Sequence, residues 1–403
     1  MARTATTALA HARDLLKRHI LIDGHNDLPW EIRNAEAHAG DIAAYDLRRR
    51  TPGHTDLPRL RRGGVGGQFW SVFVPGQRGG AGFARTQLEQ LDLARRMIAR
   101  YPRDLAPCWS SREVRAAFAA GRIASLLGME GGHVLENSMG ALRGFHELGA
   151  RYLTLTHNQT TDWADSATDE PRHGGLSPFG REVVGEMNRL GMLVDLSHVA
   201  PSTMGDALDV TEAPVIFSHS SARALCDVPR NVPDEILARI PANGGVVMVT
   251  FVAGFVSPAA AALLVPAIAE VERRLVGVTD AAERRAISRE VVDTLDVPIP
   301  PITVVADHVE HAARVAGVEH VGLGGDFDGS TFQTDGLRDV SGYPNLFAEL
   351  IDRGWTDGDL ARLAGENVLR VMREAEAVAS RLRRTGRQPS LATIGSGSIG
   401  SVG

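Results

Sequence analysis

Lysine and cysteine are scarce in this chain of 403 residues. Lysine occurs once, at Lys17, and the only cysteines are Cys108 and Cys226. Two cysteines exclude a disulfide framework, and they exclude zinc or iron–sulfur sites built mainly from thiolates. A site that needs a lysine is nearly excluded as well, because Lys17 precedes the first predicted strand.

The chain also lacks long apolar runs and an excess of positive charge. No run reaches the roughly 18 apolar residues of a membrane helix, and residues 1–20 lack the apolar core of a secretory signal. The 43 Lys and Arg against 49 Asp and Glu give a net charge of −6, whereas binding nucleic acid needs a basic surface. We therefore expect a cytoplasmic protein whose partners are neither membranes nor nucleic acids.

Short apolar runs alternate with amphipathic stretches along most of the chain. The amphipathic stretches include 86–100, 177–190 and 302–316, where apolar residues recur at helical spacing. The eight runs that we interpret as strands are 19–23, 68–74, 123–129, 152–156, 193–196, 214–218, 245–251 and 320–324. Short apolar strands joined by helical crossovers indicate a parallel sheet that is buried on both faces. The predicted fold is an α/β protein, a (β/α)8 TIM barrel.

The predicted barrel occupies residues 1–387 as a single domain. Segment 252–300 is too long for one crossover, so it predicts a helical insertion after the seventh strand. Segment 388–403 is rich in Gly and Ser and predicts a disordered C-terminal tail.

Most of the predicted strands end in a histidine or a carboxylate. In strand order these residues are His25 with Asp27, Glu130, His157, His198, His219 and Asp326. Barrels of this class carry their active-site residues at the C-terminal strand ends, and imidazole and carboxylate are ligands of zinc and related divalent ions. Any one of these residues alone is better explained as structure, but their joint placement favours a metal centre.

The spacing of these residues predicts two metal ions. His25 and Asp27 are two residues apart, so on an extended chain they point to the same face and can bind one ion. His198 and His219 follow neighbouring strands and can bind a second. Two cations roughly 3.5–4 Å apart need a bridging anion. Because a carbamylated lysine is nearly excluded, Glu130 is the natural bridge.

The other distinctive residues are interpreted as structural. His133 is assigned to a loop, and His308 and His311, three residues apart on a predicted helix, are expected to face solvent. The glycine-rich run 63–67 precedes a strand rather than a helix, which indicates a turn and not a phosphate-binding loop.

Eight motifs in the chain resemble those of the membrane (renal-type) dipeptidase family of binuclear zinc peptidases. They are IDGHNDLPW at 22–30, GGQFWSV at 66–72, EGGH at 130–133, LTLTHN at 153–158, VDLSHV at 194–199, PVIFSHSS at 214–221, RNVPD at 230–234 and HVGLGGDFDG at 320–329. The resemblance runs in order from about residue 19 to residue 372, nearly the whole chain.

The resemblance implies a (β/α)8 barrel that holds two Zn²⁺ ions per chain. By the same resemblance, one ion would bind His25 and Asp27, the other would bind His198 and His219, and Glu130 with a hydroxide would bridge them.

The family resemblance also implies roles toward a dipeptide substrate. His157 would contact the carbonyl oxygen of the scissile bond, and Arg230 would bind the C-terminal carboxylate. Asp326 would accept a proton from the bridging water. Family members hydrolyse dipeptides, tolerate a D-residue at the C-terminal position, and in some cases open β-lactam rings.

The chain departs from parts of the family pattern. It shows neither the secretory signal nor the C-terminal lipid-anchor signal of the membrane-anchored relatives. Segment 250–255 contains no tyrosine, although some relatives are expected to offer one to the substrate there.

Two alternatives to a dipeptidase stay open. One is another metal amidohydrolase on the same barrel, such as an amidase, a lactonase, a deaminase or a β-lactam hydrolase. The other is a non-catalytic barrel, which would be expected to have lost some metal positions. Glu130 as the bridge and Arg230 after the sixth strand favour the dipeptidase. A homodimer is compatible with the sequence.

Overall fold

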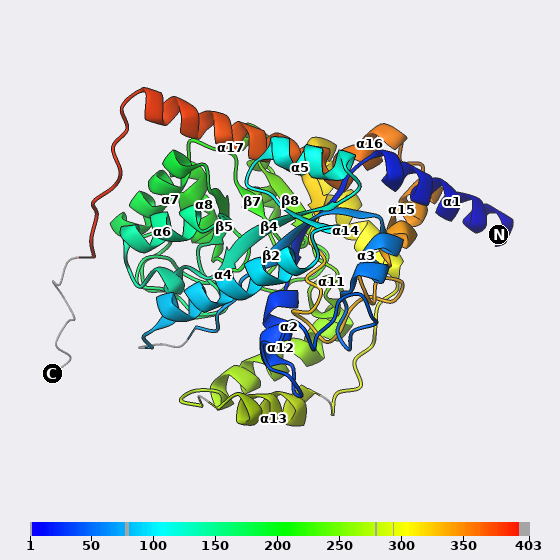
Figure 1. Cartoon of the computed structure of the whole chain (residues 1–403), viewed down its shortest axis with the longest axis horizontal. Coiled ribbons are helices and arrows are strands. Elements are labelled where there is room, and N and C mark those ends of the chain that lie inside the picture. The colour runs from blue at the N-terminus through cyan, green and yellow to red at the C-terminus, as the bar shows by residue number, and fades with distance from the viewer. Residues whose placement is uncertain (1, 77–79, 279, 293, 395–403) are drawn as a thin grey trace.

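The computed structural model describes residues 2–76, 80–278, 280–292 and 294–394. Its strands are β1 (Leu21–Asn26), β2 (Val65–Ser71), β3 (Leu105–Pro107), β4 (Ile123–Glu130), β5 (Ala150–Thr154), β6 (Leu193–Asp195), β7 (Ile216–Phe217), β8 (Val246–Val249) and β9 (Val321–Leu323). All pairings between these strands are parallel, in the order β2-β1-β9-β8-β7-β6-β5-β4-β3. Because β2 also pairs with β4, eight strands close into a barrel, which confirms the predicted fold (Figure 1).

The strand β3 was not predicted. It pairs with the start of β4, with Leu105 opposite Ile123, whereas β5 pairs with the end of β4 from Leu127 onward. β3 therefore lies beside the closed barrel. Three residues are too few to form the apolar run by which the other strands were predicted.

Helices surround the barrel and lie at both of its ends (Figure 1). They are α1 (Ala2–Arg18), α2 (Leu28–Asn34), α3 (Leu57–Gly63), α4 (Phe83–Arg100), α5 (Ser111–Ala119), α6 (Met139–Glu147), α7 (Pro178–Leu190), α8 (Pro201–Val210), α9 (Asp234–Leu237), α10 (Ile240–Asn243), α11 (Ala253–Val256), α12 (Pro258–Arg274), α13 (Ala281–Val292), α14 (Ile302–Ala316), α15 (Tyr343–Asp352), α16 (Asp357–Ala361) and α17 (Asn367–Arg384), with short turns η1 (Gly132–Leu135), η2 (Val318–His320) and η3 (Arg362–Glu366). α17 crosses one end of the barrel, whereas α2, α11 and α12 lie at the other end, where the strands finish (Figure 1). None of the helices in the described residues combines the length and the apolar character needed to cross a bilayer.

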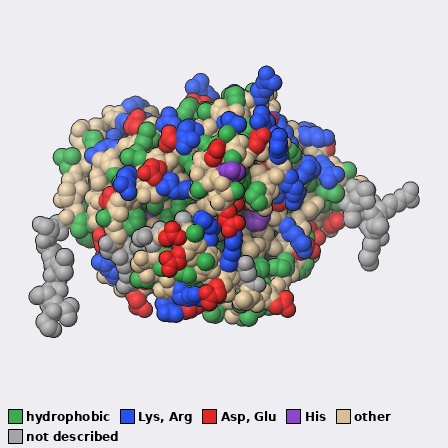
Figure 2. Space-filling model, turned by 60° about the horizontal axis from the view of Figure 1, so that its bottom comes forward, with side chains coloured by type: hydrophobic (Ala, Val, Ile, Leu, Met, Phe, Trp, Pro, Cys, Tyr) green, Lys and Arg blue, Asp and Glu red, His purple; other side chains and the backbone are tan. Residues whose placement is uncertain are grey.

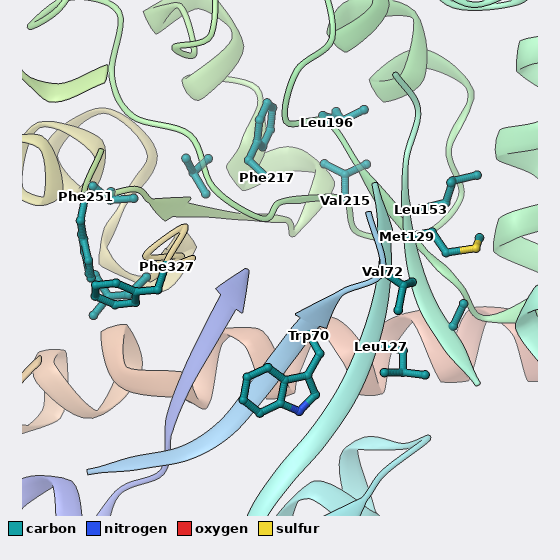
Figure 3. Packing of buried hydrophobic residues seen from close by; sticks show 14 of the residues in the cluster. Trp70, Val72, Leu127, Met129, Leu153, Leu196, Val215, Phe217, Phe251 and Phe327 are labelled. Carbon is teal, nitrogen blue, oxygen red and sulfur yellow. The ribbon is translucent and has the colours of Figure 1, made fainter. Parts of the chain in front are cut away.

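Side chains alternate between two apolar clusters along the strands. On β8, Val246 and Met248 belong to a cluster that includes Tyr152 and, on α17, Val368. Val247 and Val249 belong to the larger cluster that joins the sheet to the surrounding helices. Figure 3 shows part of this larger cluster, including Trp70, Leu127 and Phe217. Burial on both faces explains why the strands read as continuous apolar runs.

The helices predicted from local signals are present. α7 begins after Ser177, whose hydroxyl accepts a hydrogen bond from the Gly180 amide at 3.3 Å. It ends at Gly191, which has the left-handed conformation (φ +83°) that glycine adopts readily. The predicted insertion forms α11, α12 and α13, so it is helical as expected.

The prediction that His308 and His311 face solvent is wrong. His308 on α14 is fully buried, and its ring nitrogens lie 3.1 Å from the Ala222 amide and 3.1 Å from the Val256 carbonyl oxygen. His311 is 8% exposed and lies 2.7 Å from the Asp234 carboxylate. The loop after β7 and helices α9 and α11 cover this face of α14, and helical spacing alone does not reveal such covering.

The predicted tail lies partly outside the described residues, since 395–403 are not described. Within the described part, the Ser390 hydroxyl donates to Glu182 at 2.8 Å and the Ser390 amide donates to Glu186 at 3.2 Å. The first residues of this segment therefore lie along α7. Disorder of the remainder stays a prediction.

Candidate metal centre

Glu130, the last residue of β4, lies between two groups of side chains. Its Oε2 atom is 3.4 Å from His25 Nε2. Its Oε1 atom is 2.9 Å from His198 Nε2 and 3.5 Å from His219 Nε2. Each carboxylate oxygen of Glu130 thus faces a different group. We call these groups the His25 side (His25, Asp27 and Asp326) and the His198 side (His198, His219 and His157).

The His25 side combines one imidazole with two carboxylates. His25 Nε2 lies 3.2 Å from Asp27 Oδ2, and the ligand atoms of His25, Asp27 and Asp326 all lie within 4.8 Å of one another. A Cβ atom at Gly329 would lie 2.3 Å from Asp27 Oδ2 and 2.4 Å from Asp326 Oδ1, so only glycine leaves room for both carboxylates. Asp27 occupies the N-cap position of α2 with φ −90° and ψ 19°, and its side chain makes no capping hydrogen bond. The two side chains meet as predicted, although the backbone is not extended at Asp27.

The His198 side consists of three imidazoles. His198 and His219 follow the paired strands β6 and β7, as predicted, and their Nε2 atoms lie 3.0 Å apart. His157 Nε2 lies 3.9 Å from Glu130 Oε1, and its side chain is 19% exposed. His157 is thus the member of this group that a substrate can reach most directly. Figure 2 shows the face of the molecule that carries α12 and α13, where histidine side chains reach the surface among Arg, Asp and Glu.

His25 is oriented by a hydrogen bond inside the barrel. Its Nδ1 atom lies 2.8 Å from the hydroxyl of Tyr152 on β5, and that hydroxyl can donate to the Gly24 carbonyl oxygen at 3.4 Å. The Tyr152 ring lies over Gly128, where a Cβ atom would approach ring carbons to 2.0 Å. Gly128 therefore makes room for the ring that directs His25 Nε2 toward Glu130.

His219 is oriented by Ser218 and Asp195. The Ser218 hydroxyl donates to Asp195 Oδ2 at 2.6 Å and lies 2.8 Å from His219 Nδ1. A carboxylate only accepts hydrogen bonds, so the hydroxyl is used as a donor to Asp195 and accepts from His219 Nδ1. The proton of this neutral imidazole is therefore on Nδ1, and the lone pair is on Nε2.

His198 is oriented by Asn158, whose Oδ1 atom lies 3.1 Å from His198 Nδ1. The amide nitrogen of Asn158 donates to Glu272 on α12. This arrangement again places the imidazole proton on Nδ1. His198 also has a left-handed backbone (φ +69°), as does Asp326 (φ +57°). Such strain in residues other than glycine often marks functional positions.

The donor atoms of the centre fit divalent cations. The Nε2 lone pairs of His198 and His219 face each other and the Glu130 carboxylate, an arrangement of three acceptors that a cation would stabilise. On the other side, His25 Nε2 and Asp27 Oδ1 are buried and have no hydrogen-bond partner. Among the described residues, the groups able to hold a metal are His25–Glu130–His219, Glu130–His157–His198 and His25–Asp27–Asp326.

The two sides differ in electrostatics. Burial, reinforced by the positive charge of Arg230, holds the pKa values of His198 and His219 well below the ordinary histidine value. Burial acts in the same direction on His25, but interactions with Tyr152, Glu130 and Asp27 outweigh it and raise its pKa well above 6.5. The imidazoles of the His198 side are therefore neutral, whereas His25 retains a proton when no metal is bound.

The pKa values of two carboxyl groups of the centre, Glu130 and Asp326, are raised, as expected for buried acids. Burial raises the pKa of Glu130 and raises that of Asp326 well above its ordinary value, and the negative charge of Asp27 adds to both effects. Asp326 is 9% exposed and can therefore still be reached by a small molecule.

Arg230 lies next to the His198 side. Its Nη2 atom donates to the His219 carbonyl oxygen at 3.2 Å and its Nη1 atom to the Ser220 hydroxyl at 3.4 Å, while its buried Nε atom has no partner. The Phe255 ring lies 5.1 Å from the guanidinium carbon. Burial lowers the pKa of Arg230 to about 10, so the group stays charged at neutral pH.

The comparison with known families decides the class of this protein. The family model described as "Membrane dipeptidase (Peptidase family M19)" matches residues 9–386. The chain belongs to the membrane dipeptidase family. It is accordingly a metallo-dipeptidase, a hydrolase that depends on a metal cofactor, and the resemblance noted from the motifs is confirmed.

Solved structures of family members share the fold. The probable dipeptidase PvdM from Pseudomonas aeruginosa is 24% identical, with a TM-score of 0.79 over 93% of this chain and 100% of that chain. A metallo peptidase from Rhodobacter sphaeroides, solved with a phosphinate mimic of the dipeptide L-Ala-D-Ala, is 25% identical, with a TM-score of 0.72 over 89% of this chain and 99% of that chain. A structure described as the dipeptidase AC, a metallo peptidase of family M19, is also 25% identical, with a TM-score of 0.73 over 89% and 98%.

All eight predicted site residues converge on one region, but the residues that orient them were missed. Ser218 is the immediate neighbour of His219 in the sequence, so a search for partners beside each histidine could have found it. Asn158 adjoins His157 but orients His198, which is 40 residues away. Tyr152 reads as an ordinary strand residue. Glu272 lies 114 residues from Asn158 and gives no sequence signal.

Proposed function

We propose that this metallo-dipeptidase hydrolyses dipeptides with a free C-terminal carboxylate at a centre of two zinc ions. The observation that carries the proposal is Glu130, whose Oε2 atom lies near His25 and whose Oε1 atom lies near His198 and His219. His25 and Asp27 would hold one ion and His198 and His219 the other, with Glu130 shared. When bound, two zinc ions polarise a carbonyl group and lower the pKa of water, which makes hydroxide available near neutral pH.

The side chains around the ions would position the substrate and move its protons. Asp326 can take a proton from the attacking water and, because its pKa is raised, hold that proton until the leaving amine accepts it. Neutral His157 can donate a hydrogen bond to the oxygen of the scissile carbonyl group as negative charge develops on it. Arg230 suits the C-terminal carboxylate because its planar guanidinium can bind both oxygens.

Acceptance of a C-terminal D-residue is part of the proposal. It is supported by the relative from Rhodobacter sphaeroides, which was solved with a mimic of L-Ala-D-Ala. The runner-up is hydrolysis of another amide, lactone or β-lactam by the same centre. A cytoplasmic location and a homodimer also remain proposals, resting on the sequence alone.

A substrate panel on enzyme of known metal content tests the proposal. The panel pairs L,L- and L,D-dipeptides with the same peptides amidated at the C-terminus, and adds a lactone and a β-lactam. We expect close to two zinc per chain and cleavage of the free dipeptides only. Arg230→Met should reduce kcat/KM for free dipeptides. The reduction should correspond to about 2–5 kcal/mol of lost transition-state stabilisation, the cost of breaking a buried charge pair. Equal turnover of free and amidated peptides would remove Arg230 from its role.

A further inference from the structure

The inserted helix α12 is linked to the metal centre through Glu272 and Asn158. Glu272, near the C-terminal end of α12, accepts a hydrogen bond from the amide nitrogen of Asn158. The other end of the same amide lies 3.1 Å from His198 Nδ1. A chain of two hydrogen bonds therefore runs from the insertion to a histidine of the centre.

Glu272 determines which way round the Asn158 amide lies. Its ionised carboxylate can only accept hydrogen bonds, so it selects the orientation in which the amide nitrogen of Asn158 points toward it. The amide oxygen then faces His198. Without Glu272, the amide could rotate by 180° and offer its nitrogen to the imidazole instead.

The orientation of the amide in turn determines the tautomer of His198. An amide oxygen accepts only, so His198 must carry its proton on Nδ1, and Nε2 then has a lone pair directed at His219 and Glu130. We infer that Glu272 is a positioning residue, which holds His198 through Asn158 in the one tautomer that can bind the second metal ion. This inference rests on the metal site of the proposed function, and it adds Glu272 of the insertion to the residues that position that site.

The contrast with the other two histidines supports this assignment. His25 and His219 are held by Tyr152 and by Ser218 with Asp195, all of which belong to the barrel strands or directly follow them. His198 alone among the three depends on a residue from outside the barrel. Removal of that residue should therefore affect one metal site and leave the other intact.

The test compares three variants by zinc titration in competition with a chromophoric chelator. Glu272→Ala removes the acceptor, while Glu272→Gln keeps an oxygen that can accept from Asn158. Glu270→Ala is the matched control, because Glu270 is an acid on the same helix whose partner is the exposed Arg273, at 2.7 Å. We expect Glu272→Ala to weaken one of two zinc sites by about 10–100-fold, the usual effect of losing a partner of a metal ligand. Glu270→Ala should bind zinc like the parent protein. Glu272→Gln should lose less zinc affinity than Glu272→Ala, because its amide can accept from Asn158 but can also donate.

A second set of measurements separates positioning from a general structural role. In an Asn158→Leu background, Glu272→Ala should cause little further loss of zinc affinity, because the hydrogen bonds that link Glu272 to His198 are already lost. In metal-free protein, ¹⁵N chemical shifts of His198 should report a proton on Nδ1 in the parent and a shift of the proton toward Nε2 in Glu272→Ala. The shift should be smaller in Glu272→Gln.

Three results would overturn the inference. They are unchanged affinity in Glu272→Ala, equal losses in Glu272→Ala and Glu272→Gln, and a full additional loss in the Asn158→Leu background. If the parent protein itself bound fewer than two zinc ions, the proposed function would fail first, so the two failures are distinguishable.

Discussion

The two sides of the centre are held in place by different parts of the molecule. The His25 side is built from the end of β1 and from the segment that follows β9, and Tyr152 orients its histidine from within the barrel. The His198 side is more exposed at His157 and depends, through Asn158, on a helix of the insertion. Barrel strands are rigidly paired, whereas loops and insertions vary most readily. We conclude that the barrel itself positions the His25 side, whereas the insertion contributes to positioning the His198 side.

The largest effect is expected from a change at Glu130, because both sides of the centre share its carboxylate. Glu130→Gln keeps the shape of the side chain but loses the charge, so both sites should weaken together. Loss of one member of a buried charge pair costs about 3–5 kcal/mol, which is roughly a 10²–10⁴-fold loss of zinc affinity. Elemental analysis and competition titration measure it, with exposed Glu147→Gln as the control. Retention of one tightly bound zinc with normal activity would exclude a bridging role.

The next effect concerns Asp326 of the His25 side, which the proposed function assigns to proton transfer and not to holding an ion. Asp326→Asn should fold, retain both metals and lose about 10²–10⁴-fold in kcat, the usual worth of a positioned acid–base group. If Asp326 only shapes the turn to Gly329, the melting temperature should fall while kcat per folded molecule survives. Metal content, melting temperature and kcat measured on one preparation separate these outcomes.

A smaller effect is expected from Tyr152, which orients His25 from within the barrel. Tyr152→Phe removes the hydroxyl that accepts from His25 Nδ1 and leaves the ring packed over Gly128. We expect zinc affinity to fall by about 10–100-fold on the His25 side alone, the mirror image of Glu272→Ala. Adding His219→Ala to each variant assigns the remaining site. A loss on the His198 side instead would show that the two sides are not supported independently.

The smallest effect is a difference in the pH dependence of metal binding. His25 has a raised pKa and carries a proton at neutral pH, which zinc must displace, whereas His198 and His219 have lowered pKa values and are already neutral. As pH falls from 8 to 6, affinity on the His25 side should drop by about tenfold per unit for each proton displaced, and affinity on the His198 side should change less. Zinc titrations at several pH values check this, and parallel losses at both sites would contradict it.

The sequence predicted the position of the site better than its internal structure. His25, Glu130 and His219 were found because the carboxyl ends of parallel barrel strands meet at one rim, whatever the exact register. That argument holds even when the predicted end of a strand is wrong by a few residues. The first strand, for example, was predicted to end at Asp23, although β1 continues to Asn26. It could not show that β3 lies beside the barrel or that His308 is buried, since both depend on what packs against them.

The sequence by itself determined the fold class and the residues that gather at the strand ends. Apolar runs that alternate with amphipathic stretches, and the residues that follow each run, can be recognised locally along the chain. Only the tertiary structure decided how the histidines are oriented. The Tyr152 ring over Gly128, the left-handed backbone of His198 and the reach of Glu272 to Asn158 are all set by packing between distant segments. A hydrogen bond across 114 residues has no periodicity to reveal it, and yet such a bond chooses which nitrogen of an imidazole is free to bind a metal.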